Sequence, residues 1–444
     1  MSRPTVGTRG RARGPTARSV AIDVVRRVTD EGAYSNLALS RTLSRAGLDD
    51  REAAFASELA YGTLRRLVPI DRALAALVER PLDTAPKGAR AALRVGAYQL
   101  RYTRVPPHAG VSETVALADP RHKGFVNAVL RRLADAPAQA MVGTGDADVA
   151  ARTGLSEWGV RELRRLLGDE EVETAAAALA QPARVTIRTN TCATTVSELE
   201  GALAGAGVHA VRGSVQPGSL VVEHGAPSGL PGFEEGWFAV QDEASSFVVQ
   251  ALDPQPGDRV LDVCAAPGGK AAHAACLSGA RGLVVAADVS PRRLGLVRAN
   301  TERLGVRALI LAQDARRPAL RGGFDRVLVD APCSGFGSAR RRPELLWRAR
   351  KDDLSGLARL QVGIATAAAG LLRPGGRLVY SVCTFPRAET DAACDAILRR
   401  APGLEPAEIA GPDGSAERVR LWPHRHGCDG MFVAAFRRPT TPAD

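Results

Sequence analysis

The sequence lacks any long apolar run, and its first residues lack an apolar centre. No stretch approaches the roughly 18 consecutive apolar residues of a membrane-spanning helix. Residues 1–19 are rich in arginine rather than apolar, unlike a secretory signal. These absences predict a cytoplasmic protein with no membrane partner.

Cysteine is scarce, and its spacing is not that of a metal site. The seven cysteines contain no Cys-x-x-Cys pair, the spacing that structural zinc sites and redox motifs use. The sequence therefore predicts no metal, no disulfide framework and reduced thiols. Cys192, Cys276, Cys394 and Cys428 are expected to act as small apolar side chains.

Charge is unevenly distributed along the 444 residues. The net charge is +11. Residues 1–140 hold 23 Lys or Arg against 13 Asp or Glu, whereas residues 141–444 hold 36 against 35. A basic excess confined to one end is typical of a module that faces phosphates. It favours a nucleic-acid partner.

The hydrophobic pattern divides the chain into parts. Residues 1–16 are basic and carry no acidic residue, so we predict a disordered tail there. Residues 17–136 show apolar side chains at helical spacing and predict an all-α bundle. After a small, polar linker at 138–148, residues 150–257 predict helices and then a small α+β domain with short strands between Gly and Pro turns.

From residue 258 to 438, short apolar runs alternate with longer helical segments. The runs begin at Val260, Leu283, Ala308, Arg326 and Arg377. This alternation predicts an α/β, Rossmann-like domain with a mostly parallel sheet, whose ligand lies at the carboxyl ends of the strands.

A glycine turn follows the first of these strands. Cys264-Ala-Ala-Pro-Gly-Gly-Lys270 precedes a helical stretch, and such a turn lets backbone N–H groups approach a polar ligand. It is not a P-loop, which would need Gly at 264 and Ser or Thr at 271, and G-x-G-x-x-G is absent. NTP and NAD are therefore disfavoured.

Acidic residues end the next strands. Asp288 lies 20 residues beyond Gly268, where a carboxylate can accept the hydrogen bonds of ribose hydroxyls. Asp314 and Asp330 end the third and fourth strands. We predict an adenosine-binding edge. Its residues are Cys264, Ala265, Ala266, Pro267, Gly268, Gly269, Lys270, Asp288, Asp314 and Asp330.

Two further cysteines end strands on the same edge. Asp330-Ala-Pro-Cys333-Ser-Gly ends the fourth strand, and Tyr380-Ser-Val-Cys383-Thr-Phe-Pro ends the fifth. Two thiols should therefore converge beside the ligand, which favours a chemical role over simple packing.

These motifs, with Val240-Gln-Asp-Glu-Ala-Ser-Ser and Gly427-Cys-Asp-Gly-Met, resemble those of the RsmB/Nop2/Sun family of RNA cytosine-5 methyltransferases. The resemblance runs from about residue 17 to 437. The front part, including Phe125-Val-Asn-Ala-Val-Leu-Arg-Arg, is similar to the NusB-like domain of the RsmB branch. The resemblance as a whole implies a NusB-like RNA-binding domain, a small connecting domain and a class I methyltransferase domain.

The resemblance also implies roles. Cys383 would be the nucleophile, Cys333 would help to release the product, and Asp330 would contact the flipped base. S-adenosylmethionine would be the cofactor, and small-subunit ribosomal RNA, at cytosine 967 of 16S rRNA, the substrate of a monomeric enzyme. A segment with Arg340, Arg341, Pro343 and Trp347 would flank the RNA.

Two departures from the family pattern stand out. Val382 replaces the usual Thr before the nucleophile, which removes a hydroxyl, and Met431 replaces a common Phe. The alternatives are a non-catalytic ribosome-assembly factor, an enzyme acting on another RNA, and a DNA cytosine methyltransferase with Cys333 as nucleophile.

Overall fold

The computed structural model describes residues 14–137, 143–223 and 225–440. The chain forms two compact units. The first contains the described residues up to Ser156 together with Arg342–Trp347, and the second contains Glu157–Arg341 and the described residues from Arg348 onward. Most of the predicted basic tail, and half of the predicted linker, lie outside the described residues.

The first unit is a helical bundle, as the sequence predicts. Thr16 caps its first helix through a capping box with Ser19, which satisfies backbone N–H groups at the helix start. Valines on that helix pack against the bundle core. The helices are α1 (Ala17–Asp30), α2 (Ser35–Ala46), α3 (Asp50–Arg65), α4 (Leu67–Ala75), α5 (Lys87–Tyr102), α6 (Pro107–Leu117), α7 (Lys123–Asp135) and α8 (Asp146–Thr153).

Residues 342–347 belong to this unit although they lie far along the chain. The Trp347 indole N–H donates to the Leu64 carbonyl at 3.0 Å, and the Glu344 carboxylate accepts the Ser35 N–H at 3.1 Å. The segment is therefore held by the bundle rather than by the domain in which its sequence lies.

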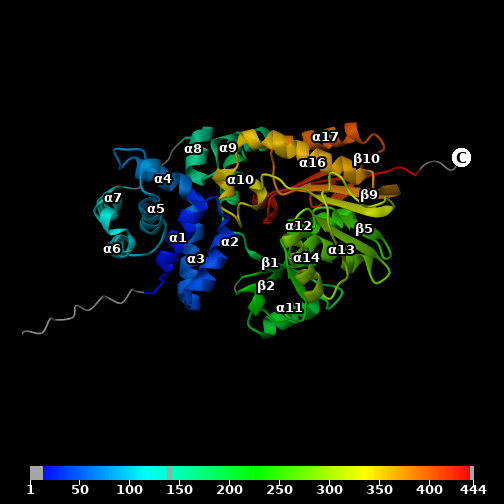
Figure 1. Ribbon diagram of the computed structural model, residues 1–444, viewed down its shortest axis with the longest axis horizontal. Helices are drawn as coiled ribbons and strands as arrows, with labels where there is room; N and C mark the ends of the chain where they lie inside the picture. The colour runs from blue at the N-terminus through cyan, green and yellow to red at the C-terminus, as the bar shows by residue number, and fades with distance from the viewer. Residues whose placement is uncertain (1–13, 138–142, 224, 441–444) are drawn as a thin grey trace, which may run out of the picture. The chain divides into compact units, whose positions relative to one another are not determined.

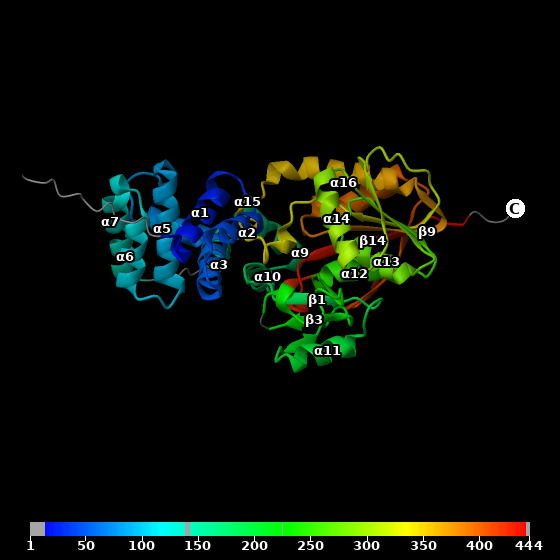
Figure 2. The ribbon, with the colours of Figure 1, turned by 60° about the horizontal axis from the view of Figure 1, so that its bottom comes forward.

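The second unit begins with α9 (Glu157–Leu167) and α10 (Val172–Leu179), followed by a small α+β part. Its four strands are antiparallel in the order β2-β3-β1-β4. Figure 2 shows α11 (Val196–Gly205) beside this sheet, and its Leu199 and Leu203 join the core there. The strands are β1 (Val185–Thr189), β2 (Ala210–Arg212), β3 (Ser219–Val222) and β4 (Phe238–Val240).

The larger sheet of the second unit follows a Rossmann-like order. The path is β10-β14-β9-β8-β5-β6-β7, and β13 also pairs with β14. The five strands from β9 to β7 are parallel, as predicted, and β14 joins β9 antiparallel. The parallel strands are β5 (Arg259–Asp262), β6 (Leu283–Asp288), β7 (Leu309–Ala312), β8 (Phe324–Asp330) and β9 (Leu372–Val382).

The antiparallel edge of this sheet was not predicted. It contains β10 (Glu405–Ala407), β13 (Arg418–Leu421) and β14 (Met431–Arg437), and a separate pair is formed by β11 (Ile409–Gly411) and β12 (Gly414–Ala416). The first residues of β14 pair with the last residues of β9, with Phe432 opposite Val382, which brings the Gly427–Met431 motif next to the end of the strand that Cys383 follows.

Helices cover both faces of the sheet (Figure 1). On one face lie α12 (Glu243–Leu252), α13 (Gly269–Ser278) and α14 (Pro291–Arg303), and on the other lie α16 (Leu354–Ala369) and α17 (Asp391–Arg400). Each face buries its own apolar cluster. This two-sided burial explains why the parallel strands are almost continuously apolar.

No helix within the described residues is both long enough and apolar enough to span a bilayer.

One sequence-based expectation about cysteine is wrong. Cys192, in the turn after β1, and Cys276, on α13, form a disulfide across a separation of 84 residues. Neither cysteine is a free thiol, contrary to the expectation. Their pairing depends on tertiary packing rather than on a short motif. Cys394 and Cys428 are buried free thiols, as expected.

Candidate active site

The predicted site residues lie at one edge of the parallel sheet. Because β5, β6, β7, β8 and β9 are parallel, their carboxyl ends meet at the same edge. Cys264 follows β5, Asp288 ends β6, Asp330 ends β8 and Cys383 follows β9. Asp314 lies just after β7. The tertiary fold therefore brings these residues to one edge from five strands.

The glycine turn is held by backbone contacts to its neighbours. The Ala265 N–H donates to the Ala287 carbonyl at 2.8 Å, and the Ala266 N–H donates to the Asp288 carboxylate at 3.3 Å. Gly268 has φ +109°, and a Cβ there would lie 2.9 Å from the Val297 Cα. Both the backbone conformation and the close approach of α14 therefore require glycine.

The three strand-end carboxylates differ in environment. Asp288 is buried, accepts the Ser290 N–H at 2.9 Å and lies 3.4 Å from Arg293. Asp314 is only partly buried and is bonded to Arg316, whose hydrogen bond lowers the pKa of Asp314 to about 2. Asp288 is therefore the better-fixed acceptor for a ligand.

Lys270 and Asp330 form an ion pair at the centre of the edge. The Lys270 Nζ lies 2.8 Å from the Asp330 Oδ2, and the Ser381 hydroxyl donates to the Asp330 Oδ1 at 2.8 Å. Burial is the largest single effect and lowers the pKa of Lys270, but the charge and hydrogen bond of Asp330, together with the charges of Cys383 and Asp262, raise that pKa overall. Lys270 thus stays cationic beside the thiol.

Asp262, the last residue of β5, is a site residue that the sequence reasoning missed. Its Oδ1 accepts the Cys264 N–H at 3.2 Å, and within the described part of the chain its buried Oδ2 has no hydrogen-bond partner. Burial, followed by the charge of Asp330, raises the pKa of Asp262 to about 7. An acidic residue immediately before the glycine turn was the available signal.

The two predicted reactive cysteines meet. The Sγ atoms of Cys333 and Cys383 lie 3.5 Å apart, within hydrogen-bond distance for sulfur. The pKa of the Cys333 thiol is raised well above its usual range by the hydrogen bond between Cys333 and Cys383, together with burial. Cys333 is therefore held as a thiol that can donate to the neighbouring sulfur.

The loop after Cys383 is anchored by the glycine motif near the C-terminus. The Gly337 N–H donates to the Cys383 carbonyl at 3.0 Å, and the Gly430 N–H donates to the Gly337 carbonyl at 2.9 Å. A Cβ on Gly337 would lie only 2.0 Å from the Gly430 oxygen. Glycine is therefore required for this close backbone approach.

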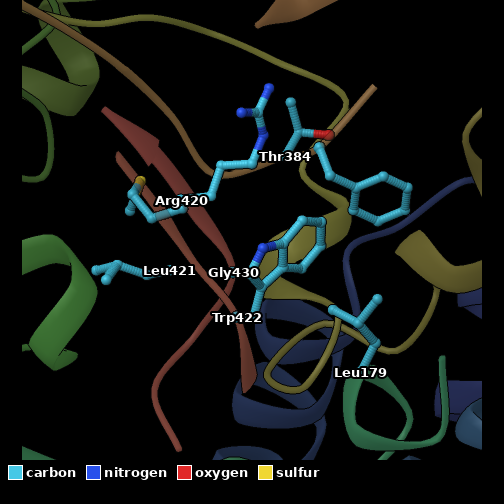
Figure 3. Close-up of a pocket in the computed structure, with 8 residues that line it drawn as sticks. Leu179, Thr384, Arg420, Leu421, Trp422 and Gly430 are labelled. Atoms are coloured by element: carbon cyan, nitrogen blue, oxygen red, sulfur yellow. The ribbon is translucent and has the colours of Figure 1, made fainter. Parts of the chain in front are cut away.

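A small pocket is lined by this loop and by residues of β13 and β14. Figure 3 shows Thr384 and Arg420 on one side of it, with Trp422 nearby. Met431, the residue that departs from the family pattern, also lines the pocket. The full lining is Leu179, Thr384, Phe385, Arg420, Leu421, Trp422, Gly430 and Met431.

The segment expected to flank RNA is largely used for internal contacts. Arg340 is buried and donates to the carbonyls of Gly427 and Cys428 at 2.6 and 2.9 Å. Arg341 bridges the carboxylates of Asp242 and Asp429, each at 2.8 Å. These two arginines therefore connect three sequence motifs to one another, and their placement gives no support for RNA contacts.

Three family models match successive parts of the chain. Residues 15–135 match the NusB family, residues 155–228 match the RsmF/B-like ferredoxin-like domain, and residues 249–437 match the 16S rRNA methyltransferase RsmB/F model. Ribosomal RNA small subunit methyltransferase B of Pseudomonas syringae pv. tomato is 36% identical, over 90% of this chain and 92% of its own. The chain belongs to the RsmB/F methyltransferase family.

Other similar proteins and solved structures cover between two thirds and nearly all of this RsmB/F chain. A Mycobacterium tuberculosis protein is 39% identical over 97% of the chain and 99% of its own length. The solved structure of PH0851 has a TM-score of 0.81 at 25% identity and covers 96% of this chain and 99% of that one. A methyltransferase homologue from Pyrococcus horikoshii has a TM-score of 0.58 at 29% identity, over 67% of this chain and 100% of that one.

Proposed function

We propose that this RsmB/F protein methylates carbon 5 of a cytosine in small-subunit ribosomal RNA, at cytosine 967 of 16S rRNA, through a covalent cysteine adduct. The observation that carries the proposal is the 3.5 Å approach of Cys333 to Cys383 beside the Lys270–Asp330 pair. Paired thiols at a ligand-binding edge are not needed for a merely structural, RNA-binding role.

The strand-end residues fit S-adenosylmethionine. The start of α13 follows the glycine turn, Asp288 provides a fixed carboxylate for ribose hydroxyls, and the unpaired Oδ2 of Asp262 offers a further hydrogen-bonding group. Asp314 and the turn residues Cys264 to Lys270 would complete the site. When bound there, S-adenosylmethionine supplies an electrophilic methyl group.

Cys383 would act as the nucleophile because carbon 5 of cytosine is too unreactive on its own. Addition of the Cys383 sulfur to carbon 6 breaks the carbon 5–carbon 6 double bond and moves electron density to carbon 5. The Lys270 ammonium and the Cys333 S–H both favour the thiolate form of Cys383.

Cys333 would act after methylation. The proton on carbon 5 leaves to a base or a water molecule, and its electron pair re-forms the double bond as the Cys383 sulfur departs from carbon 6. Because Cys333 is held as a thiol against that sulfur, it is placed to assist the departure. Asp330 would contact the base, which must leave its stack to enter the site.

A single incubation tests the proposal against its alternatives. The protein is incubated with methyl-labelled S-adenosylmethionine and naked 16S rRNA, tRNA or duplex DNA. We expect label in 16S rRNA as 5-methylcytosine at position 967. Label in tRNA or DNA alone would refute the rRNA assignment, and no label in any substrate, despite RNA binding, would indicate a non-catalytic assembly factor.

A further inference from the structure

Glu389 is a buried carboxylate that the mechanism above does not use. It ends the short 3-10 turn Arg387–Glu389, six residues after Cys383, and its side chain has no solvent exposure. Burial raises the pKa of Glu389, whereas hydrogen bonds from Ser334 and Gln361 oppose that shift. Burying a carboxylate costs free energy unless hydrogen-bond donors satisfy it. The donors that bond Glu389 therefore indicate its structural role.

Those partners belong to the loop that carries Cys333. The Glu389 Oε1 accepts the Ser334 backbone N–H and the Gln361 Nε2, each at 2.9 Å, and its Oε2 accepts the Ser334 hydroxyl. Gln361 also donates to the Pro332 carbonyl at 2.9 Å. Residues on both sides of Cys333 are therefore bonded to Glu389 or to its partner.

The same network reaches the loop that carries Cys383. The Ser334 Oγ lies 2.7 Å from the Thr384 Oγ1, and Thr384 directly follows Cys383. The Tyr380 hydroxyl donates to the backbone carbonyl of Glu389 at 2.7 Å, which ties the turn back to β9. The Ser334 and Thr384 hydroxyls, each next to a cysteine, are thus bonded to each other, and the Ser334 hydroxyl is also bonded to the Glu389 carboxylate.

Ionisation of Glu389 would set the direction of this chain of hydroxyls. An ionised carboxylate only accepts hydrogen bonds, so the Ser334 hydroxyl must donate to Glu389. The Ser334 oxygen then accepts the Thr384 hydroxyl. Each hydroxyl proton then has one acceptor in this network, and neither loop can shift without breaking a part-buried hydrogen bond.

We propose that Glu389 is a positioning residue: through Ser334 and Thr384 it clamps the two cysteine loops and so holds the Cys333 and Cys383 sulfurs in register. This inference rests on the proposed function for its catalytic consequence. Its geometric part, the distance between the two sulfurs, does not depend on any RNA.

Thr384 provides a matched pair of variants. Thr384→Ser keeps the hydroxyl that bonds Ser334, whereas Thr384→Val keeps the shape of the buried side chain and removes that hydroxyl. Glu389→Gln keeps the length of the side chain but replaces one acceptor oxygen with a donor, which reverses the hydroxyl chain. None of the three creates a large cavity, so all should fold.

The catalytic test follows turnover and the covalent protein–RNA adduct. Thr384→Val and Glu389→Gln should lower kcat by at least about 10-fold, as misplacement of reacting groups does, and should accumulate a methylated adduct because release is impaired. S-adenosylmethionine affinity should stay within about twofold, since the clamp does not touch its site. Thr384→Ser should behave like the unaltered protein. Equal turnover in Thr384→Val and Thr384→Ser would overturn the proposal.

A second test needs no RNA and no methylation. Diamide, a diazene oxidant, takes two hydrogens from two thiols and leaves a disulfide, and peptide mapping by mass spectrometry reports the Cys333–Cys383 cross-link. It should form in the unaltered protein and in Thr384→Ser, and at least about fivefold more slowly in Thr384→Val and Glu389→Gln.

The two tests fail independently. If the unaltered protein does not methylate RNA, the proposed function is wrong, yet the cross-linking rates still decide whether Glu389 and Thr384 position the sulfurs. A cross-link that is absent from the unaltered protein, or that forms as fast in Thr384→Val as in Thr384→Ser, overturns the positioning role.

Discussion

The Sγ atoms of Cys333 and Cys383 lie 3.5 Å apart, although 50 residues separate them in the sequence. They meet because β8 and β9 are adjacent parallel strands and each cysteine follows the carboxyl end of its strand. Because both thiols lie at the same edge, either sulfur could attack the cytosine. Replacing each cysteine should give a different defect under the two assignments.

Replacing each cysteine distinguishes attack from release. If Cys383 attacks, Cys383→Ala should abolish methylation and form no adduct, whereas Cys333→Ala should accumulate RNA bound covalently through Cys383. The measurement is a denaturant-resistant protein–RNA band that carries the labelled methyl group. The double variant should lack the band, and a band with Cys383→Ala instead would reverse the two roles.

Asp288→Ala should weaken S-adenosylmethionine binding. Two ribose hydroxyls would lose a charged acceptor, and each such hydrogen bond contributes roughly 1.5 to 3 kcal/mol. Calorimetry measures the affinity, with Asp395→Ala on α17 as a control carboxylate away from the strand ends. Unchanged affinity in Asp288→Ala would refute the placement of the adenosine.

The buried Asp262 should make stability fall as pH rises. Its pKa is about 7 in the folded protein and about 3.9 when unfolded, so between these values the folded state holds a proton that the unfolded state has released. The stabilisation is complete below about pH 4 and is lost as pH rises through 7. Asp262→Asn removes this dependence and should gain up to about 4 kcal/mol relative to the unaltered protein between pH 4 and pH 8.

Urea unfolding at pH 5 and pH 8 checks this prediction. Asp314→Asn is the control, because the pKa of Asp314 is lowered to about 2 and the group does not titrate in that range. The raised pKa of Asp262 would be contradicted if Asp262→Asn and the unaltered protein differed by the same free energy of unfolding at both pH values. The variant should also bind S-adenosylmethionine more weakly.

Arg341→Met should destabilise the protein by leaving two buried acids without their cation. Removing one partner of a buried ion pair costs about 3 kcal/mol or more, and both Asp242 and Asp429 lose a contact at 2.8 Å. Burial, followed by the charge of Asp242, already raises the pKa of Asp429 to about 6. The loss should therefore be smaller at pH 5, where Asp429 is protonated.

Adding Asp242→Asn and Asp429→Asn to Arg341→Met should recover most of the lost stability, as measured by urea unfolding. If the triple variant is no more stable than Arg341→Met alone, packing of the arginine side chain, not charge compensation, accounts for its role.

Local pattern was sufficient to predict much of this protein. The alternation of short apolar runs and helical segments predicted the parallel strands, because the apolar periodicity of a strand or a helix depends only on residues close together in the sequence. The glycine turn and the acidic residues at strand ends predicted the edge of the sheet that would carry a site. The roles of Cys383, Cys333 and Asp330 stay predictions until the experiments above are done.

Tertiary structure decided what distant residues do to one another. The antiparallel strand β14, the disulfide between Cys192 and Cys276, the bridge made by Arg341 and the clamp around Glu389 join segments far apart in the chain. None carries a local signature, because each depends on which loops the folded sheet brings together. The sequence by itself determined that two thiols would follow two strand ends. Only long-range packing determined that their sulfurs would lie within hydrogen-bond distance and that the buried Glu389 carboxylate would bond the residue after Cys333.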